Sequence, residues 1–208
     1  MMEFTDFKKS YGQQLVLDIC KASLPDGVYW LRGGNGIGKS TLLRSMAGMS
    51  GFKGQLTLNG LSMKKHGSAF RKTVNFAEAE PVYPEFLTGT ELIGMFDQAK
   101  GKGFFFPDKL IADMQMTGYV ESPIGSYSSG MLKKLSLALA FLGRPDWILL
   151  DEPLNALDVD AIKMLYQWIE QARMQRLNLI LSSHQALDLE QIPGCALLDI
   201  TDKNLFIR

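Results

Sequence analysis

The sequence predicts an α/β fold, with a mostly parallel sheet flanked by helices, an antiparallel β part at the N-terminus and an inserted helical part. Three observations predict this fold. A glycine-rich segment, Gly33 to Ser40, connects a β-type run to a helix-favouring segment. The runs Trp147–Leu150 and Leu177–Ser182 are apolar without polar alternation, which is typical of central parallel strands covered on both faces. Residues from about 81 to 142 read as helices that interrupt the alternation of strands and helices.

The N-terminal part reads as short strands with turns between them. Strands are expected at Glu3–Lys9 and Gln14–Cys20, on either side of a turn at Tyr11-Gly12-Gln13. Two further short strands are expected at Gly54–Asn59, which is bounded by glycine, and at Thr73–Phe76.

The middle part carries three helix signals. Thr88 and Glu91 have the spacing of a capping box ahead of an apolar run, so a helix begins there and ends at the glycines near residue 101. Pro107–Met116 suits a second helix, with proline in its first turn. Ser129–Leu142 is apolar nearly all round, which predicts a buried helix.

The last third returns to alternating elements. Asp158–Arg176 is amphipathic and is expected to be a helix that follows the first buried strand. Ala196–Ile200 and Leu205–Ile207 are expected to close the chain as edge strands. The predicted core is therefore a doubly wound α/β sheet.

The glycine-rich segment fits the pattern G-x-x-x-x-G-K-[ST] at every fixed position. It follows the β-type run Val28–Leu31 and precedes the helical segment Ser40–Ala47, which is the context that this pattern needs. Glycines let backbone N–H groups turn inward and form an anion-binding concavity, and the helix N-terminus adds positive charge. Lys39 is expected to reach the β- and γ-phosphates, and the Ser40 hydroxyl to ligate Mg²⁺.

Polar residues follow both buried strands. Asp151 and Glu152 stand at the carboxyl end of the first, where α/β sheets place their ligands. Asp151 suits the Mg²⁺ shell and Glu152 suits a general base that activates water. His184 follows the second strand and is either a structural residue or a sensor that donates a hydrogen bond to the γ-phosphate. The other histidine, His66, lies in a polar loop.

Composition narrows the classes of function. The chain has 208 residues, which suits one compact domain, and equal numbers of basic and acidic residues, 22 of each. A zero net charge argues against a protein that binds the phosphate backbone of nucleic acid. Cys20 and Cys195 lie far apart and read as free thiols of a reducing compartment. We expect no signal peptide and no membrane span, because no apolar run nears 18 residues.

Tyr127-Ser128-Ser129-Gly130-Met131, about 20 residues before the Asp-Glu strand, completes a series of motifs. With the phosphate loop, Asp151-Glu152, the segment Asn155-Ala156-Leu157-Asp158 and His184, it resembles the nucleotide-binding domain of ABC (ATP-binding cassette) proteins across essentially the whole chain. The resemblance implies a single P-loop NTPase domain. Its catalytic core would comprise residues 1–80 and 143–208, and its helical subdomain, with the signature, about 81–142.

The resemblance also implies site residues and partners. Two subunits of this family bind head to tail with two ATP molecules between them, and separate membrane subunits complete the transporter at the inner face of the cell membrane. Ser128 and Gly130 would contact the γ-phosphate held by the other subunit, and Tyr11 would stack on adenine. The implied catalytic residues are Lys39, Glu152 and His184. The implied ATP-binding residues are Tyr11, Gly33, Gly34, Asn35, Gly36, Ile37, Gly38, Lys39, Ser40, Thr41, Ser128, Gly130 and Asp158; the Mg²⁺ ligands are Ser40, Glu78 and Asp151.

The sequence departs from the family pattern in three places. The glutamine that touches Mg²⁺ in this family is replaced by a glutamate, Glu78 by spacing or Glu80 in an alternative register. The signature differs from Leu-Ser-Gly-Gly-Gln at three of its five positions, and Asn155 replaces a common serine. The phosphate-contacting positions of the signature, Ser128 and Gly130, are intact. We expect an active ATPase, because Lys39, Ser40, Asp151, Glu152 and His184 are all present.

The resemblance favours an export-type transporter subunit. The alternative is the ATPase of a haem exporter used in cytochrome c maturation, which the short length and bare C-terminus resemble. A soluble ABC ATPase acting on nucleic acid or in iron–sulfur assembly is a further class; the chain lacks the coiled-coil insertion or second cassette of the nucleic-acid and ribosome-associated members.

Apolar side chains gather between Glu78 and the signature. They either fill the core of the helical part or line a groove that receives a short helix of a membrane subunit. The groove hypothesis fails if Tyr83, Phe86 and Phe104 to Phe106 are all fully buried. The cluster comprises Val82, Tyr83, Phe86, Leu87, Met95, Phe96, Phe104, Phe105 and Phe106.

Overall fold

A computed structural model describes residues 1–208, which form two sheets and six α-helices. The first sheet has four strands in the order β2-β1-β4-β5, and all its pairs are antiparallel. It confirms the predicted N-terminal β part, although its first two strands run longer than expected. Its strands are β1 (Met2–Tyr11), β2 (Gln14–Leu24), β4 (Lys53–Leu58) and β5 (Leu61–Ser62).

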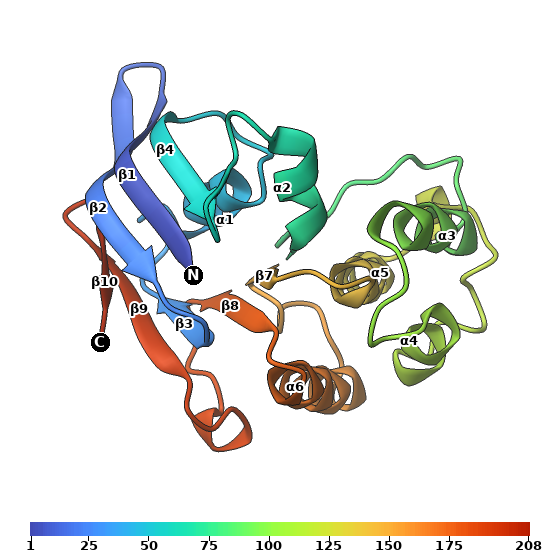
Figure 1. The fold of residues 1–208 in the computed structure, drawn as a ribbon. Helices are drawn as coiled ribbons and strands as arrows, with labels where there is room; N and C mark the ends of the chain where they lie inside the picture. Colours follow the sequence, from blue (N-terminus) through green and yellow to red (C-terminus); the bar gives the residue numbers. More distant parts are fainter.

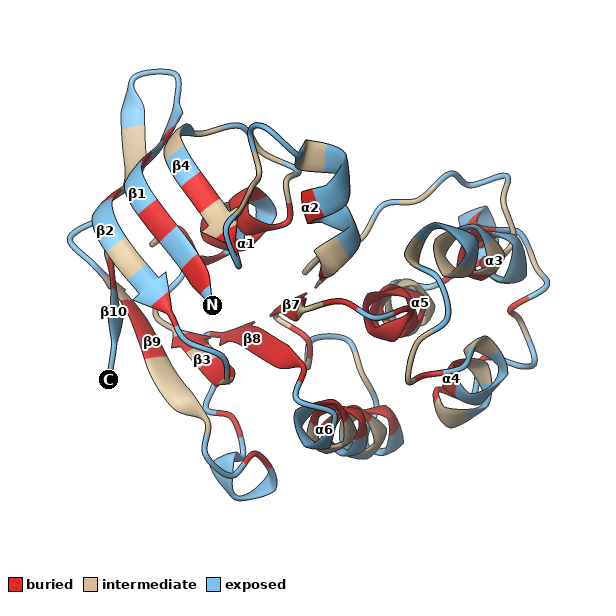
Figure 2. Cartoon of the chain, in the orientation of Figure 1, coloured by how far each residue is buried: buried red, intermediate tan, exposed pale blue.

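The second sheet has six strands in the order β10-β9-β3-β8-β7-β6. Every neighbouring pair is parallel except the hairpin of β9 and β10. Strands β7 and β8 are buried along their whole length, as their unbroken apolar sequences predict (Figure 2). The strands are β3 (Val28–Arg32), β6 (Val74–Ala77), β7 (Trp147–Asp151), β8 (Asn178–Ser183), β9 (Ala196–Thr201) and β10 (Asn204–Ile207).

The prediction that both C-terminal strands lie at an edge is wrong for β9. This strand pairs with β3 on one side and with β10 on the other. It carries a polar residue, Asp199, that suggests an exposed edge, but the Asp199 carboxylate is bound by Arg32 and Arg208. Those contacts let a charged residue sit inside the sheet.

The helices divide between two sides of the molecule. Helices α3, α4 and α5 contact one another and gather opposite the antiparallel sheet, whereas α6 packs against β8 (Figure 1). Two short 3-10 turns occupy Ile124–Ser126 and Leu189–Gln191. The α-helices are α1 (Lys39–Met46), α2 (Gly67–Thr73), α3 (Gly89–Lys100), α4 (Pro107–Asp113), α5 (Ser129–Phe141) and α6 (Val159–Met174).

Helix boundaries follow local chemistry. Thr88 and Glu91 form the predicted capping box at the start of α3. Helix α4 ends three residues before the predicted Met116, because the chain enters the left-handed region at Gln115, with φ of 56°. The sequence reading missed α2, in which Phe70 is the one buried residue and apolar periodicity is therefore absent.

Two apolar cores lie on the two faces of the parallel sheet. One cluster of 31 buried residues joins α3, α4, α5 and α6, and the other, of 21, lies among α1 and the antiparallel sheet. Asn75 of β6 donates hydrogen bonds to the carbonyls of Ala140 and Leu142 and thereby fixes the end of α5 to the sheet. Cys20 and Cys195 are free, as predicted. No helix is both long enough and apolar enough to cross a bilayer.

Candidate functional site

The glycine-rich loop between β3 and α1 takes a shape that side chains would prevent. Gly33 has φ of 144°, and a Cβ there would lie 2.0 Å from Ile37 Cδ1. Gly38 caps α1 in a left-handed conformation, with φ of 109°, and a Cβ would press against Val16 and Leu17 of β2. The loop therefore bends tightly into the N-terminus of α1, where free backbone N–H groups favour an anion.

Lys39 lies folded into this loop. Its ammonium donates hydrogen bonds to the carbonyls of Gly33, at 2.7 Å, and Gly34, at 3.2 Å. The side chain is 6% exposed. Beside it is a cavity of about 300 Å³, large enough for a polyphosphate. Most of the predicted ATP-binding residues line it: Tyr11, Gly34, Asn35, Gly36, Gly38, Lys39, Ser40 and Thr41, together with Val16 and Glu152. The predicted residues Gly33 and Ile37 shape the loop from behind and do not line the cavity.

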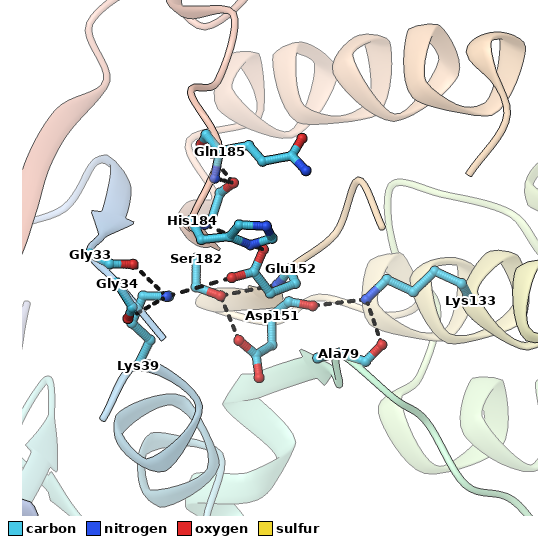
Figure 3. A network of polar contacts seen from close by, with 11 residues as sticks. Gly33, Gly34, Lys39, Ala79, Lys133, Asp151, Glu152, Ser182, His184 and Gln185 are labelled. Carbon is cyan, nitrogen blue, oxygen red and sulfur yellow. Dashed lines mark hydrogen bonds and ion pairs between the residues drawn. The ribbon is translucent and has the colours of Figure 1, made fainter. Parts of the chain in front are cut away.

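Glu152 lines this cavity and lies between Lys39 and His184. Its Oε1 lies 3.6 Å from Lys39 Nζ, and its Oε2 lies 2.9 Å from His184 Nδ1 (Figure 3). The backbone N–H of His184 also donates to Oε2. The structure thus brings together all three predicted catalytic residues, which come from α1, the end of β7 and the end of β8. A carboxylate in this position can orient and deprotonate a water molecule that lies against a bound phosphate.

Asp151 is buried at the end of β7. Its Oδ1 accepts a hydrogen bond from the Ser182 hydroxyl at 2.5 Å, while its Oδ2 is buried without any partner. A buried carboxylate oxygen without a donor is costly, and a hard cation that prefers oxygen ligands would satisfy it. The geometry therefore suits the predicted Mg²⁺ ligand. No group of three or more histidine, cysteine, aspartate or glutamate side chains is placed to hold a metal ion.

The peptide between Asp151 and Glu152 is held from both sides. Its carbonyl accepts a hydrogen bond from Lys133 Nζ at 2.8 Å, and its N–H donates to Ser182 Oγ at 3.0 Å. Glu152 adopts the left-handed conformation, with φ of 44°, which costs about 1–2 kcal/mol for a residue with a side chain. Burial lowers the pKa of Lys133 to about 8.

Comparison with known proteins identifies the family. A family model described as "ABC transporter" matches residues 17–155, which are most of the chain. The chain belongs to the ABC transporter family. It is the ATP-binding subunit of an ABC transporter, and an ATPase.

Two curated relatives and one solved structure give the range of similarity. The lantibiotic transport ATP-binding protein SrtF of Streptococcus pyogenes is 27% identical over 92% of this chain and 83% of its own. The bacitracin transport ATP-binding protein BcrA of Bacillus licheniformis is 27% identical over 92% of this chain and 64% of its own. The dimeric post-hydrolysis state of an ATP-binding cassette bound to ADP and Pi superposes with a TM-score of 0.80, at 16% identity, over 99% of this chain and 96% of that one. The structural likeness confirms the fold.

The signature of this ABC subunit lies away from its own phosphate loop. Ser128 caps α5 by accepting a hydrogen bond from the N–H of Met131. Neither Ser128 nor Gly130 lines the phosphate cavity. Asp158 caps α6, and its carboxylate, whose pKa is lowered by the hydrogen bond from Lys134 of α5, also lies at the signature side. One chain therefore presents the phosphate loop and the signature as two separate surfaces.

The two glutamates that are candidates for the family glutamine position, Glu78 and Glu80, do not line the phosphate cavity. Glu78 follows β6 directly, and its carboxylate forms an ion pair with Arg44 of α1 at 2.8 Å. It lines a different, apolar cavity and not the phosphate cavity. Glu80 lies beside the start of α5. The role of Glu78 as a Mg²⁺ ligand stays a prediction. To reach the ion, the Glu78 carboxylate would have to release Arg44.

Sequence reasoning missed two residues that position the site. Ser182 binds both Asp151 and the N–H of Glu152, and its signal was a polar residue at the end of a buried strand. Lys133 is only 1% exposed within the apolar helix α5. Its signal was a charge in a helix that was predicted to be buried on all sides.

Proposed function

We propose that two copies of this chain close head to tail around two ATP molecules and thereby drive export through separate membrane subunits. The observation that carries the proposal is the Glu152 carboxylate, which lies between Lys39 and His184 at the mouth of the phosphate cavity. Phosphoryl transfer to water needs positioning and electrostatic stabilisation, and these residues supply both.

Each residue has a distinct task in hydrolysis. Lys39 exchanges its bonds to the loop carbonyls for the β- and γ-phosphates of ATP and offsets their charge. Glu152 accepts the proton of the attacking water. His184, already bonded to Glu152, orients that carboxylate and donates to the γ-phosphate. Tyr11, half exposed at the end of β1, offers its ring to the adenine.

Mg²⁺ fits the oxygen atoms that are present. Asp151 and the exposed Ser40 hydroxyl would hold the ion together with the phosphates and water, with Glu78 as a further candidate. The ion would neutralise charge on the β- and γ-phosphates. Ser182 orients the Asp151 carboxylate toward this task through its hydroxyl.

A dimer would complete each site. Because one chain carries both an intact phosphate loop and an intact signature, two identical copies can supply both halves of both sites. The exposed Ser128 at the N-terminus of α5 offers free N–H groups and a hydroxyl to a γ-phosphate held by the partner. ATP would then stabilise the closed dimer by contacting both surfaces. The related cassette described above is itself dimeric.

Export is favoured by the relatives. SrtF and BcrA are named for lantibiotic and bacitracin transport, and each matches over 92% of this chain. The haem-exporter alternative has no such support. The neutral net charge continues to disfavour a nucleic-acid partner.

An apolar groove is the proposed docking site for a membrane subunit. Here the docking groove means the cavity of about 250 Å³ beside Glu78, lined among others by Met49, Phe76, Val82, Tyr83 and Phe96. Val82 is 89% exposed, which is unusual for valine, and the nearby Phe86 is 81% exposed. Phe105 alone of the predicted cluster's phenylalanines is fully buried, so the condition that would refute the groove hypothesis is not met. A short amphipathic helix would suit this surface, and its arrival would act on Glu78 directly.

The proposed function is tested by replacing Glu152, the proposed general base for ATP hydrolysis. Glu152→Gln should bind ATP with a dissociation constant within about threefold of the wild type, hydrolyse it at least 100-fold more slowly, and form an ATP-dependent dimer in light scattering. Asp160→Asn, an exposed acid on α6, is the matched control and should change none of these. Rapid hydrolysis by Glu152→Gln would refute the assignment of the base.

A further inference from the structure

Lys133 is the one buried charged residue of α5, a helix that packs largely in the core. It lies on the second turn of α5 and is 1% exposed, among buried leucine and alanine residues. The next residue, Lys134, reaches the surface side and pairs with Asp158. Burying an ammonium costs free energy unless hydrogen-bond acceptors replace the water that it loses. The acceptors of Lys133 therefore indicate which part of the structure it holds in place.

All its acceptors are backbone carbonyls at the carboxyl ends of two strands. Its Nζ lies 2.8 Å from the carbonyl oxygen of Glu78. It lies 3.4 Å from the carbonyl oxygen of Ala79 and 2.8 Å from that of Asp151 (Figure 3). Glu78 and Ala79 follow β6, and Asp151 ends β7. A single side chain from the signature helix therefore fastens together the two loops from which Glu78 and Glu152 project.

The hydrogen bond from Lys133 to the Asp151 carbonyl affects Glu152, because that carbonyl belongs to the peptide group that joins Asp151 to Glu152. The Asp151 carbonyl points to Lys133, and the Glu152 N–H on the opposite side of the same plane points to Ser182 Oγ. With both ends held, the plane cannot rotate, and Glu152 is kept at its left-handed φ of 44°. That conformation directs the carboxylate between Lys39 and His184.

We propose that Lys133 is a positioning residue for ATP hydrolysis, which holds the Asp151–Glu152 peptide in the orientation that aims the Glu152 carboxylate at the attacking water. The inference rests on the proposed role of Glu152 as the base. Lys133 is buried and does not line the phosphate cavity. Lys133 acts on Glu152 of its own subunit. In the proposed dimer, α5 would therefore present the signature to the ATP held by the partner and position the base that acts on the ATP held by its own phosphate loop.

Lys133→Met is the direct test, because methionine keeps the length and apolar stem of lysine and removes the three hydrogen bonds. We expect kcat for ATP to fall about 10- to 100-fold, the loss typical of a misplaced catalytic group, while KM and the dissociation constant for ATP stay within about threefold. Lys100→Met is the matched control. Lys100, at the end of α3, is partly buried, and its Nζ also donates to two backbone carbonyls, those of Arg71 in α2 and Val74 in β6. It should lose comparable thermal stability and keep kcat within about twofold.

A double-mutant cycle separates positioning from general damage. If Lys133 acts through Glu152, then adding Lys133→Met to Glu152→Gln should change the residual single-turnover rate by less than about twofold, because no base remains to be aimed. Lys133→Arg, which keeps a donor, should recover part of kcat.

Several results would overturn the inference. They are an unchanged kcat in Lys133→Met, an equal loss in Lys100→Met, or losses that multiply in the double variant. Should Lys133→Met fail to fold, an unchanged kcat in the folded Lys133→Gln variant would have the same force. If instead Glu152→Gln itself hydrolyses ATP rapidly, the proposed base is wrong, whatever Lys133 does.

Discussion

The Nδ1 atom of His184 lies 2.9 Å from Oε2 of Glu152. The two residues directly follow neighbouring parallel strands, β7 and β8, so their meeting is a direct result of sheet order. The pairing leaves one nitrogen of the imidazole free to face a phosphate, and it restrains the carboxylate that we assign as the base.

This pairing predicts the behaviour of His184→Ala. The variant should lower kcat about 100-fold, as the loss of a single transition-state donor does in other enzymes, and leave ATP affinity within about threefold. His66→Ala is the matched control, since His66 precedes α2 without a side-chain cap bond, and it should behave as the wild type. Steady-state ATPase assays check both. Equal rates for the two variants would show that His184 is structural.

Lys39→Ala should weaken nucleotide binding itself. Its ammonium is the cation nearest the phosphate loop, and its bonds to Gly33 and Gly34 shape that loop. We expect the dissociation constant for ATP, measured by calorimetry, to rise about 10- to 100-fold, or about 1.4 to 2.8 kcal/mol. Lys65→Ala, on the exposed segment before α2, should have no effect. Unchanged affinity in Lys39→Ala would place the phosphates elsewhere.

If the docking groove binds the membrane subunit, a variant in it should lose the membrane subunit and keep its basal ATPase activity. Val82→Asp puts a charge at the exposed rim and should abolish co-purification with the membrane subunit, while basal ATPase activity of the isolated subunit stays within about twofold. Met174→Asp, at another exposed apolar position, on α6, should keep the partner. Loss of the partner in both variants, or in neither, would contradict the assignment of the groove.

Lys100 makes stability depend on pH in the alkaline range. Burial lowers its pKa from 10.5 to about 8 in the folded chain. Between these values the unfolded chain binds more protons at this residue, so raising the pH through this window favours the folded state. The free energy of unfolding of the wild type, relative to that of Lys100→Met, should therefore rise from pH 7.5 to pH 10 in urea titrations. A constant or falling difference would contradict the burial of this ammonium.

The sequence predicts the parts of this fold that short-range chemistry determines. The phosphate loop, the capping box at Thr88 and the buried strands around Asp151 and His184 follow from patterns in neighbouring residues, and the structure confirms each. The rest depends on contacts distant in sequence. The edge prediction is wrong for β9, because a contact such as that of its Asp199 with Arg32, 167 residues earlier, cannot be read from neighbouring residues.

The site shows the same division. Lys39, Glu152 and His184 could be named from motifs, because each motif has a physical task at a known place in the fold. The hydrogen bonds of Lys133 to carbonyls 18 and 55 residues away, and the ion pair of Glu78 with Arg44, come from packing that no local pattern records.

The most direct test of the account asks whether the phosphate loop of one copy meets the signature of another. Asn35→Cys and Ser129→Cys, both at exposed positions, would be placed in a Glu152→Gln chain whose own cysteines are replaced by Cys20→Ser and Cys195→Ala. Under mild oxidation with Mg²⁺ and ATP, we predict a disulfide-linked dimer that is absent without nucleotide and absent when either cysteine is present alone. A chain that binds ATP yet forms no more cross-linked dimer than without it would contradict the shared-site mechanism.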